Sequence, residues 1–197
     1  MNQKHFQNGL LILFCILLPL FILLLSYKIV LYFAELTPNQ ENTFNFLLDK
    51  KQQNIEFNDL QYTEQEIAHL VDVKQLMGIM DYIFYSLLLV LTLILTYCRK
   101  NKEVITKMLK YGGISVIAVE LILFLLVLIS FNSSFTAFHH LFFPQGNWTF
   151  PADSLLIQTF PLQFFVKISQ TLLFQAFLGG IIFILISLYL KNESVRN

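Results

Sequence analysis

The sequence contains few charged residues: lysine, arginine, aspartate and glutamate together make up 13% of its 197 residues. Soluble globular domains usually carry about 25%, so this composition argues against a soluble domain and favours an integral membrane protein. The formal net charge is zero, which gives no indication of a nucleic-acid partner. The chain also has no Gly/Ser-rich linker and no internal repeat, so we expect a single membrane domain over residues 1–197.

Long apolar runs make up much of the sequence. Four of them, at about residues 10–33, 82–98, 113–131 and 172–190, are long enough, or nearly so, to cross ~30 Å of hydrocarbon as helices. No small-residue cleavage site follows the first run, so it is expected to be a retained anchor and not a signal peptide. The sequence therefore predicts an all-α membrane protein with four transmembrane helices.

Basic residues are unevenly distributed between the segments that join these runs. The loop at residues 99–112 is rich in Lys and Arg, and both ends of the chain carry basic residues, whereas residues 34–81 are acidic and residues 132–171 are nearly uncharged. Lys and Arg are enriched on the cytoplasmic side of membrane proteins. We therefore expect both termini and the 99–112 loop to be cytoplasmic, and the other two segments to form a small extracytoplasmic cap.

Cysteine is scarce as well, and its positions exclude part of the possible chemistry. Cys15 and Cys98 both lie toward the predicted cytoplasmic ends of their spans, so the cap contains no thiol. A disulfide framework and a cysteine nucleophile are therefore excluded from the cap.

Histidines are the most informative titratable residues of the cap. His139 and His140 lie beside and among eight aromatic residues within residues 138–165. Titratable imidazoles in apolar surroundings indicate a functional site, although two ordinary interfacial histidines are the competing interpretation. Neighbouring residues on a helix point about 100° apart, so at most one of the two is expected to share a site with a histidine from elsewhere.

A third histidine lies on a helix whose start is clearly marked. Thr63 and Glu66 form a capping-box pattern, and this helix is expected to continue to about Met77. His69 and Asp72 are three residues apart on it and share a face, so the carboxylate can orient the imidazole. An ordinary surface pair on the helix is the alternative. A metal site of two histidines and a carboxylate is also conceivable, but the spacing matches no ligand motif, and we expect neither a metal nor another cofactor.

Polar residues in the spans are assigned no chemistry. Glu120 lies inside the third span, where a carboxylate is a functional hypothesis by default. Its simpler interpretation is a neutral side chain, or one hydrogen-bonded to Gln175 or Ser187. Lys28 is expected to extend toward the outer surface; if it pointed into the bundle, it would suit an anionic headgroup.

In order along the chain, the cap motifs resemble the lipoprotein intramolecular transacylase family of Gram-positive bacteria. These motifs are residues 69–74, Phe138-His139 with Phe142-Phe143, Trp148 with Phe150, Leu155-Leu156-Ile157, and Phe160-Pro161 with Phe164-Phe165. The resemblance covers nearly the whole chain and includes the order of spans and outer segments.

This resemblance implies an enzyme of the bacterial cell membrane with its active site on the extracytoplasmic side. Its members move the sn-2 acyl chain of a diacylglyceryl lipoprotein in the outer leaflet to the α-amine of the same lipoprotein's N-terminal cysteine, which gives a lyso-form lipoprotein. The resemblance assigns acid–base catalysis without a covalent acyl-enzyme to His69 and His139, and assigns nothing to His140. We expect Asp72 to support His69, and six aromatic residues to shape the substrate pocket: Phe138, Phe142, Phe143, Trp148, Phe150 and Phe164.

The expected partners are lipoprotein substrates and membrane lipid, and the chain is expected to be a monomer. A hypothesis of another class is a non-enzymatic membrane accessory protein whose aromatic cap binds a lipid or protein partner. A transporter is disfavoured, because the sequence has no inverted repeats and no paired broken helices.

Overall fold

The computed structural model describes residues 3–48 and 62–196, and the regular elements in these ranges are α-helices. They are α1 (Gln3–Tyr32), α2 (Pro38–Leu48), α3 (Glu64–Cys98), α4 (Lys102–Ile129), α5 (Phe131–Phe142), α6 (Leu155–Thr159) and α7 (Leu162–Arg196). Four of them, α1, α3, α4 and α7, are long and apolar enough to cross a membrane. The prediction of an all-α membrane protein with four candidate transmembrane helices is confirmed.

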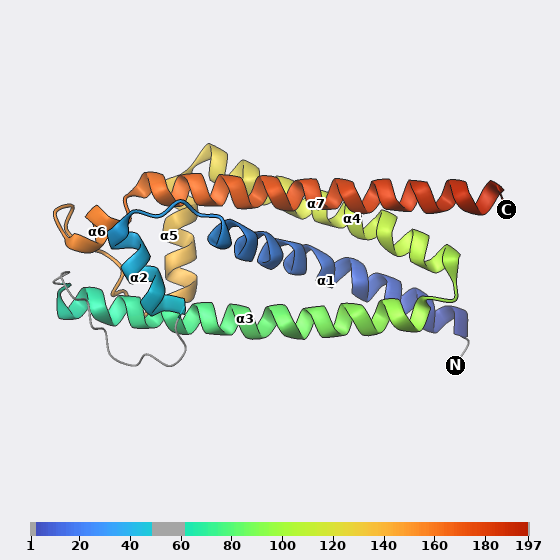
Figure 1. Cartoon of the computed structure of the whole chain (residues 1–197), viewed down its shortest axis with the longest axis horizontal. Coiled ribbons are helices and arrows are strands. Elements are labelled where there is room, and N and C mark those ends of the chain that lie inside the picture. The colour runs from blue at the N-terminus through green and yellow to red at the C-terminus, as the bar shows by residue number, and fades with distance from the viewer. Residues whose placement is uncertain (1–2, 49–61, 197) are drawn as a thin grey trace.

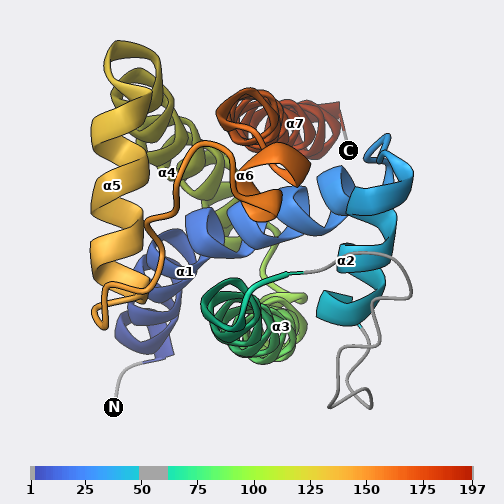
Figure 2. The ribbon, with the colours of Figure 1, turned by 90° about the vertical axis from the view of Figure 1, so that its left-hand side faces the viewer.

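The four long helices form a bundle, and the three short helices gather at one end of it (Figure 1). We call α2, α5, α6 and the first turns of α3 and α7 the cap. The start of α1, the end of α7 and the connection from α3 to α4 lie at the opposite end (Figure 1). In the end-on view, α5 and α2 lie on opposite sides, with α6 and the start of α3 between them (Figure 2).

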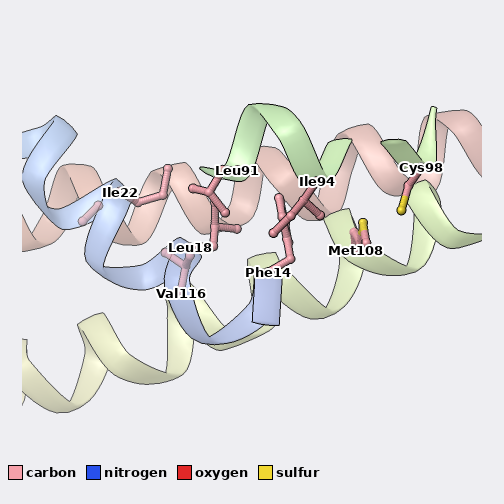
Figure 3. Close-up of a cluster of buried hydrophobic side chains, with 9 residues drawn as sticks. Phe14, Leu18, Ile22, Leu91, Ile94, Cys98, Met108 and Val116 are labelled. Atoms are coloured by element: carbon pink, nitrogen blue, oxygen red, sulfur yellow. The ribbon is translucent and has the colours of Figure 1, made fainter. Parts of the chain in front are cut away.

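Aliphatic packing holds the bundle together. Its core combines buried side chains from all four long helices (Figure 3): Phe14, Leu18, Ile22, Leu91, Ile94, Cys98, Met108, Val116 and Ala176. Helices α4 and α7 lie close together where Gly113 meets Gly180: a Cβ atom added at Gly113 would lie 2.6 Å from the Gly180 carbonyl oxygen. Small residues permit this kind of close approach between membrane helices.

Helix α3 links the bundle to the cap. Its start has the predicted capping box, in which the Thr63 hydroxyl accepts from the Glu66 N–H and the Glu66 carboxylate accepts from the Thr63 N–H. The helix has 35 residues, or about 52 Å at 1.5 Å per residue, so it is longer than the ~30 Å of hydrocarbon.

The prediction that the helix begun at Thr63 ends near Met77 is wrong, because α3 continues to Cys98. A single glycine at position 78 costs only about 1 kcal/mol in a helix, and the long apolar run that follows carries the helix through.

The chain changes direction sharply between α4 and α5. Ser130 is both the last cap residue of α4 and the N-cap of α5, where its hydroxyl accepts from the Ser133 N–H at 3.4 Å. The helix that contains the predicted third span therefore ends at Ile129, and α5 runs across the end of the bundle (Figures 1 and 2).

Candidate active site

Two histidines that are 70 residues apart in the sequence meet in the cap. His69 lies in the second turn of α3, and His139 lies near the end of α5. Their ring centroids are 6.1 Å apart, with the ring planes 28° from parallel. Both side chains are buried, at 7% and 8% exposure. Helices α3 and α5 therefore bring two imidazoles together in a mostly dry environment.

Aromatic rings surround this pair. The Phe143 ring lies 4.9 Å from His69 and 5.5 Å from His139, measured between centroids. Phe150 lies 5.6 Å from His69, and Trp148 lies 4.9 Å from His139. Such contacts exclude water from the imidazoles and strengthen electrostatic interactions between the groups inside.

The other three aromatic residues predicted for the pocket have different positions. Phe138 contacts His139 at 5.6 Å, so it belongs to the same cluster. Phe142 contacts Phe138 and is 44% exposed, which places it on the outer surface of α5. Phe164 packs in the core of the cap against Phe160, at 5.3 Å. It supports the cap from behind, whereas Phe138 faces an imidazole.

The protonation pattern of His139 follows from its backbone contact. Its Nδ1 lies 2.8 Å from the Phe135 carbonyl oxygen, and a carbonyl oxygen only accepts hydrogen bonds. Nδ1 therefore carries the hydrogen, and Nε2 keeps its lone pair. Burial lowers the pKa of His139; the bond to Phe135 opposes this shift, and the neighbouring His140 adds to it. Phe135 was not among the predicted site residues, although its i, i+4 spacing from His139 on a helix could have identified it.

Asp72 anchors the loop between α5 and α6. Its Oδ2 accepts hydrogen bonds from Gln145 Nε2 at 2.8 Å and from Asn147 Nδ2 at 2.6 Å. Gly146 separates the two amides and has φ of +79°, a region that glycine adopts without strain. The sequence analysis had no signal for Gln145 or Asn147, because a turn with positive φ decides that both amides point at one carboxylate.

His140 lies outside the pair. It is exposed, and its only ring contact in the part of the chain described is an edge-on one with Trp148 at 5.3 Å. The expectation that at most one of the adjacent histidines faces His69 is confirmed, because successive residues on α5 point in different directions.

Lys28 and Glu120 are distant from this cluster in the sequence and make other contacts. Lys28 pairs with Asp81 at 2.5 Å, beside a cavity of about 340 Å³ lined by α1, α2 and α3.

Glu120 is fully buried, and its carboxylate has no hydrogen-bond partner in residues 3–48 and 62–196. The alternative of a hydrogen bond to Gln175 or Ser187 is wrong. Ser187 instead donates to a main-chain carbonyl of α4.

No three His, Cys, Asp or Glu side chains among the described residues are grouped so that they could hold a metal ion. The cluster that remains is a pair of imidazoles, one carboxylate held by two amides, and a ring of aromatic side chains. Imidazoles can accept and donate protons near neutral pH, and burial favours the neutral, proton-accepting form of both side chains here. The site can therefore perform acid–base chemistry on a substrate that reaches the membrane end of the cap.

The fold and this site together define an integral membrane protein with paired imidazoles in an aromatic cap. Residues 34–165 match the family model described as "Lipoprotein intramolecular transacylase Lit". The chain therefore belongs to the Lit family of lipoprotein intramolecular transacylases, which are acyltransferases, and the resemblance found in the sequence is confirmed. No curated protein matches the chain significantly.

Solved structures of a relative support the fold. The chain is similar to the membrane integral lipoprotein intramolecular transacylase Lit from Bacillus cereus, with a TM-score of 0.85, 21% identity, and coverage of 99% of this chain and 100% of that one. A structure of the same relative with one histidine replaced by arginine gives a TM-score of 0.81 at 20% identity, and covers 98% of this chain and 96% of that one. At this level of identity the likeness concerns the fold.

Proposed function

We propose that this chain transfers the sn-2 acyl chain of a diacylglyceryl lipoprotein to the α-amine of the same lipoprotein's N-terminal cysteine, and so makes a lyso-form lipoprotein. The main support for this proposal is that the His69 and His139 side chains are both buried among aromatic rings, with their ring centroids 6.1 Å apart. Family membership supplies the reaction class, which is transacylation.

The substrate contains both reactants. The amine nitrogen attacks the ester carbonyl carbon, a C–N bond forms, and the C–O bond to the glyceryl oxygen breaks. The nitrogen loses a proton to a base, and the departing oxygen gains one from an acid, so the products are an amide and a free sn-2 hydroxyl. An α-amine has a pKa near 8, so a base is needed, and a neutral imidazole is well matched to the task.

Two close imidazoles can divide these proton transfers. Placing a second positive charge beside the first is unfavourable in a buried site, so the pair carries at most one positive charge near neutral pH. One imidazole then accepts the amine proton, and in this protonated form it stabilises the developing oxyanion or, directly or through the other imidazole, returns the proton to the leaving oxygen. No nucleophile from the enzyme is required, in agreement with a cap that lacks cysteine.

Positioning supplies much of the rate. Holding an amine and an ester in contact can contribute up to ~7–11 kcal/mol. The rings of Phe143, Trp148 and Phe150 exclude water from the imidazoles, and water would otherwise hydrolyse the ester. We assign the surface of the substrate site to these rings and to Phe138 and Phe142, with Phe164 as support from the cap core.

We also propose that the cap faces the extracytoplasmic side. The end of the bundle opposite the cap carries the basic connection at residues 99–101, followed by Lys102 and Lys107 on α4. Basic residues at membrane-proximal positions favour the cytoplasmic side. The site then meets diacylglyceryl lipoproteins in the outer leaflet, and neither a cofactor nor a second copy of the chain is needed for the reaction.

Separate replacement of the two histidines tests this function. Purified His69→Ala and His139→Ala proteins are reconstituted in liposomes with a diacylglyceryl lipopeptide, and the product N-terminus is identified by fragmentation mass spectrometry. The intact mass is uninformative, because intramolecular transfer conserves it. We expect both variants to lose N-acylation by at least about 100-fold. The matched control, His140→Ala, changes an exposed imidazole beside the pair and should retain the activity.

Retention of the normal rate in either variant would overturn the catalytic assignment of that histidine. If the wild-type protein alone gave no transfer, and aromatic truncations but not histidine changes mattered in cells, the accessory-protein hypothesis would replace the enzymatic one.

A further inference from the structure

The amide of Asn147 has a fixed orientation. Its Nδ2 lies 2.6 Å from Asp72 Oδ2, and a carboxylate only accepts hydrogen bonds. The atom that faces Asp72 must therefore be the NH₂ group, and the amide oxygen must face another partner. Asp72 thus determines which way round the Asn147 side chain lies.

The oxygen of this amide and one nitrogen of His69 are both buried without a hydrogen-bond partner among the described residues. These atoms are Oδ1 of Asn147 and Nδ1 of His69. Asp72, the partner of Asn147 Nδ2, lies one turn from His69 on the same face of α3, and the Asn147 side chain opposes the lowering of the His69 pKa by burial. Buried polar atoms are nearly always paired in native proteins, and these two complement each other, since an amide oxygen accepts and a ring nitrogen can donate.

We propose that Asn147, oriented by Asp72, fixes the tautomer of His69 with the hydrogen on Nδ1 and the lone pair on Nε2. Asn147 is then a positioning residue that acts through His69, and it does not itself touch the reacting atoms. The inference rests on the proposed function only for its consequence, namely that a fixed tautomer matters for acyl transfer. The tautomer itself can be measured without any reaction.

The proposed arrangement makes the two histidines equivalent. His139 already donates from Nδ1 to the Phe135 carbonyl oxygen at 2.8 Å, which leaves its Nε2 unprotonated. With His69 held in the same way by Asn147, both imidazoles present an Nε2 lone pair, and either can take a proton without first exchanging its ring hydrogen. The Phe135 carbonyl oxygen thus fixes the tautomer of His139, and the Asn147 amide oxygen fixes the tautomer of His69.

Gln145 provides a matched control. Its side chain is exposed and comes from the same turn, and its Nε2 donates to the same Asp72 oxygen at 2.8 Å. Among the described residues, no hydrogen bond joins the Gln145 side chain to His69. Replacing Gln145 by alanine removes one donor to Asp72 and leaves the path from Asp72 through Asn147 to His69 intact. A merely structural role of the loop would make Gln145→Ala and Asn147→Ala alike.

The test uses the full-length protein with ¹⁵N-labelled histidine in detergent micelles, at about pH 8.5, where imidazoles are neutral. Nitrogen NMR distinguishes protonated from unprotonated ring nitrogens, and the His69 signals are assigned by their loss in His69→Gln. We expect wild type and Gln145→Ala to show His69 with the hydrogen on Nδ1. Asn147→Ala should show a mixture of tautomers.

A swap variant tests the mechanism by rescue. Asn147→Asp alone places two carboxylates in contact and should disturb the loop. In the double variant Asp72→Asn/Asn147→Asp, the amide introduced at position 72 can donate to the carboxylate introduced at position 147, which can still accept from His69 Nδ1. We expect the swap to restore the wild-type tautomer, and this variant keeps the test decisive if Asn147→Ala is poorly folded.

Activity measurements connect the tautomer to the reaction. We expect Asn147→Ala to lower kcat on the order of 10²-fold with little change in KM, the lower end of what a positioned base contributes, and Gln145→Ala to change kcat less than about threefold by the same scale. An unchanged His69 tautomer in Asn147→Ala, or an equal change in Gln145→Ala, would overturn the inference. If the tautomer shifts as expected while His69→Gln still transfers acyl chains at the normal rate, the positioning stands and the catalytic role of His69 fails.

Discussion

The bundle and the cap are stabilised by different interactions. The bundle core consists of aliphatic and aromatic side chains from four long helices. The cap is smaller, and buried hydrogen bonds connect its short helices: Gln40 Nε2 donates to the Thr159 carbonyl oxygen at 2.8 Å, and Glu66 Oε1 accepts from the Leu156 N–H at 2.8 Å. The cap therefore adds buried polar contacts to an apolar core of its own, whereas the bundle packs mainly through apolar side chains.

Buried polar side-chain atoms without a hydrogen-bond partner among the described residues reveal a second difference. In the cap they lie at one place, on His69, Asn147 and Trp148, whereas in the bundle they lie on Glu120 and Gln175. The cap is otherwise well paired, so its unpaired atoms mark the place where a substrate or a neighbouring side chain completes the contacts. The bundle atoms lie in the membrane-spanning helices and away from the histidines.

Among the changes that separate the cap from the bundle, removing Glu66 should have the largest effect, because it disrupts the cap and leaves the bundle intact. The Glu66 carboxylate accepts from the Leu156 N–H, the Thr63 N–H and the Thr63 hydroxyl. Glu66→Ala leaves these donors unpaired, at about 1–3 kcal/mol for each one that is buried. We expect transacylation to fall on the order of 100-fold, since small misplacements of a site are enough for such losses.

The control for Glu66 is Glu64→Ala, which removes an exposed carboxylate from the same helical turn. Proteolysis of the reconstituted protein should cleave the cap faster in Glu66→Ala only, while the circular dichroism of the long helices stays close to wild type. Loss of helical signal throughout would show that cap and bundle do not separate in this way.

A methyl group between α4 and α7 should disrupt the bundle in the complementary manner. At Gly113 an added Cβ meets the Gly180 carbonyl oxygen at 2.6 Å, whereas at Gly78 it meets nothing within 4 Å. Gly113→Ala should therefore lower the free energy of unfolding by about 1–3 kcal/mol through overpacking. Gly78→Ala should raise it by up to about 1 kcal/mol through helix propensity. Thermal unfolding in detergent checks the opposite signs; equal effects would argue against tight α4–α7 packing.

The pKa of His139 reports how far water is excluded from the cap site. Burial lowers the pKa of His139, so its imidazole should stay neutral at pH 7 and gain a proton only below the ordinary value near 6.5. Phe143→Ala opens the site, because Phe143 is only 3% exposed and contacts both histidines. We expect the NMR titration midpoint of His139 to rise toward 6.5 in this variant. A wild-type midpoint at or above 6.5 would contradict a dry site.

Sequence reasoning predicted the parts of the fold that depend on local pattern. Apolar length identified the four long helices, and the Thr63–Glu66 pattern identified the start of α3. The apolar run predicted the end of the third span near residue 131, and α4 ends at Ile129. Helix α5 was not predicted, because polar residues at 132–134 interrupt the apolar pattern and its start depends on the capping hydroxyl of Ser130. The chain's change of direction there is nevertheless what brings α5 across the bundle.

The site was only partly predictable. Helix geometry allowed no more than one of the adjacent histidines to share a site with His69, but no spacing rule connects residues 70 positions apart, and the pairing with His139 came from the family resemblance. Asn147 could not be found, because its role depends on the turn at Gly146 and on the amide orientation that Asp72 imposes. Long-range partners of this kind require three-dimensional contacts.

The smallest effect is expected for Glu120, the carboxylate inside the third predicted span, to which the sequence analysis assigned no chemistry. Its carboxylate is fully buried and has no hydrogen-bond partner in the part of the chain that the structure describes. Glu120→Gln keeps the shape and breaks no hydrogen bond there, so transacylation should stay within about twofold of wild type, since only groups that lose an interaction are penalised. The same assay that follows the histidine variants measures this. A loss comparable to that of His139→Ala would mean that the bundle takes part in the chemistry, and the assignment of the chemistry to the cap alone would be wrong.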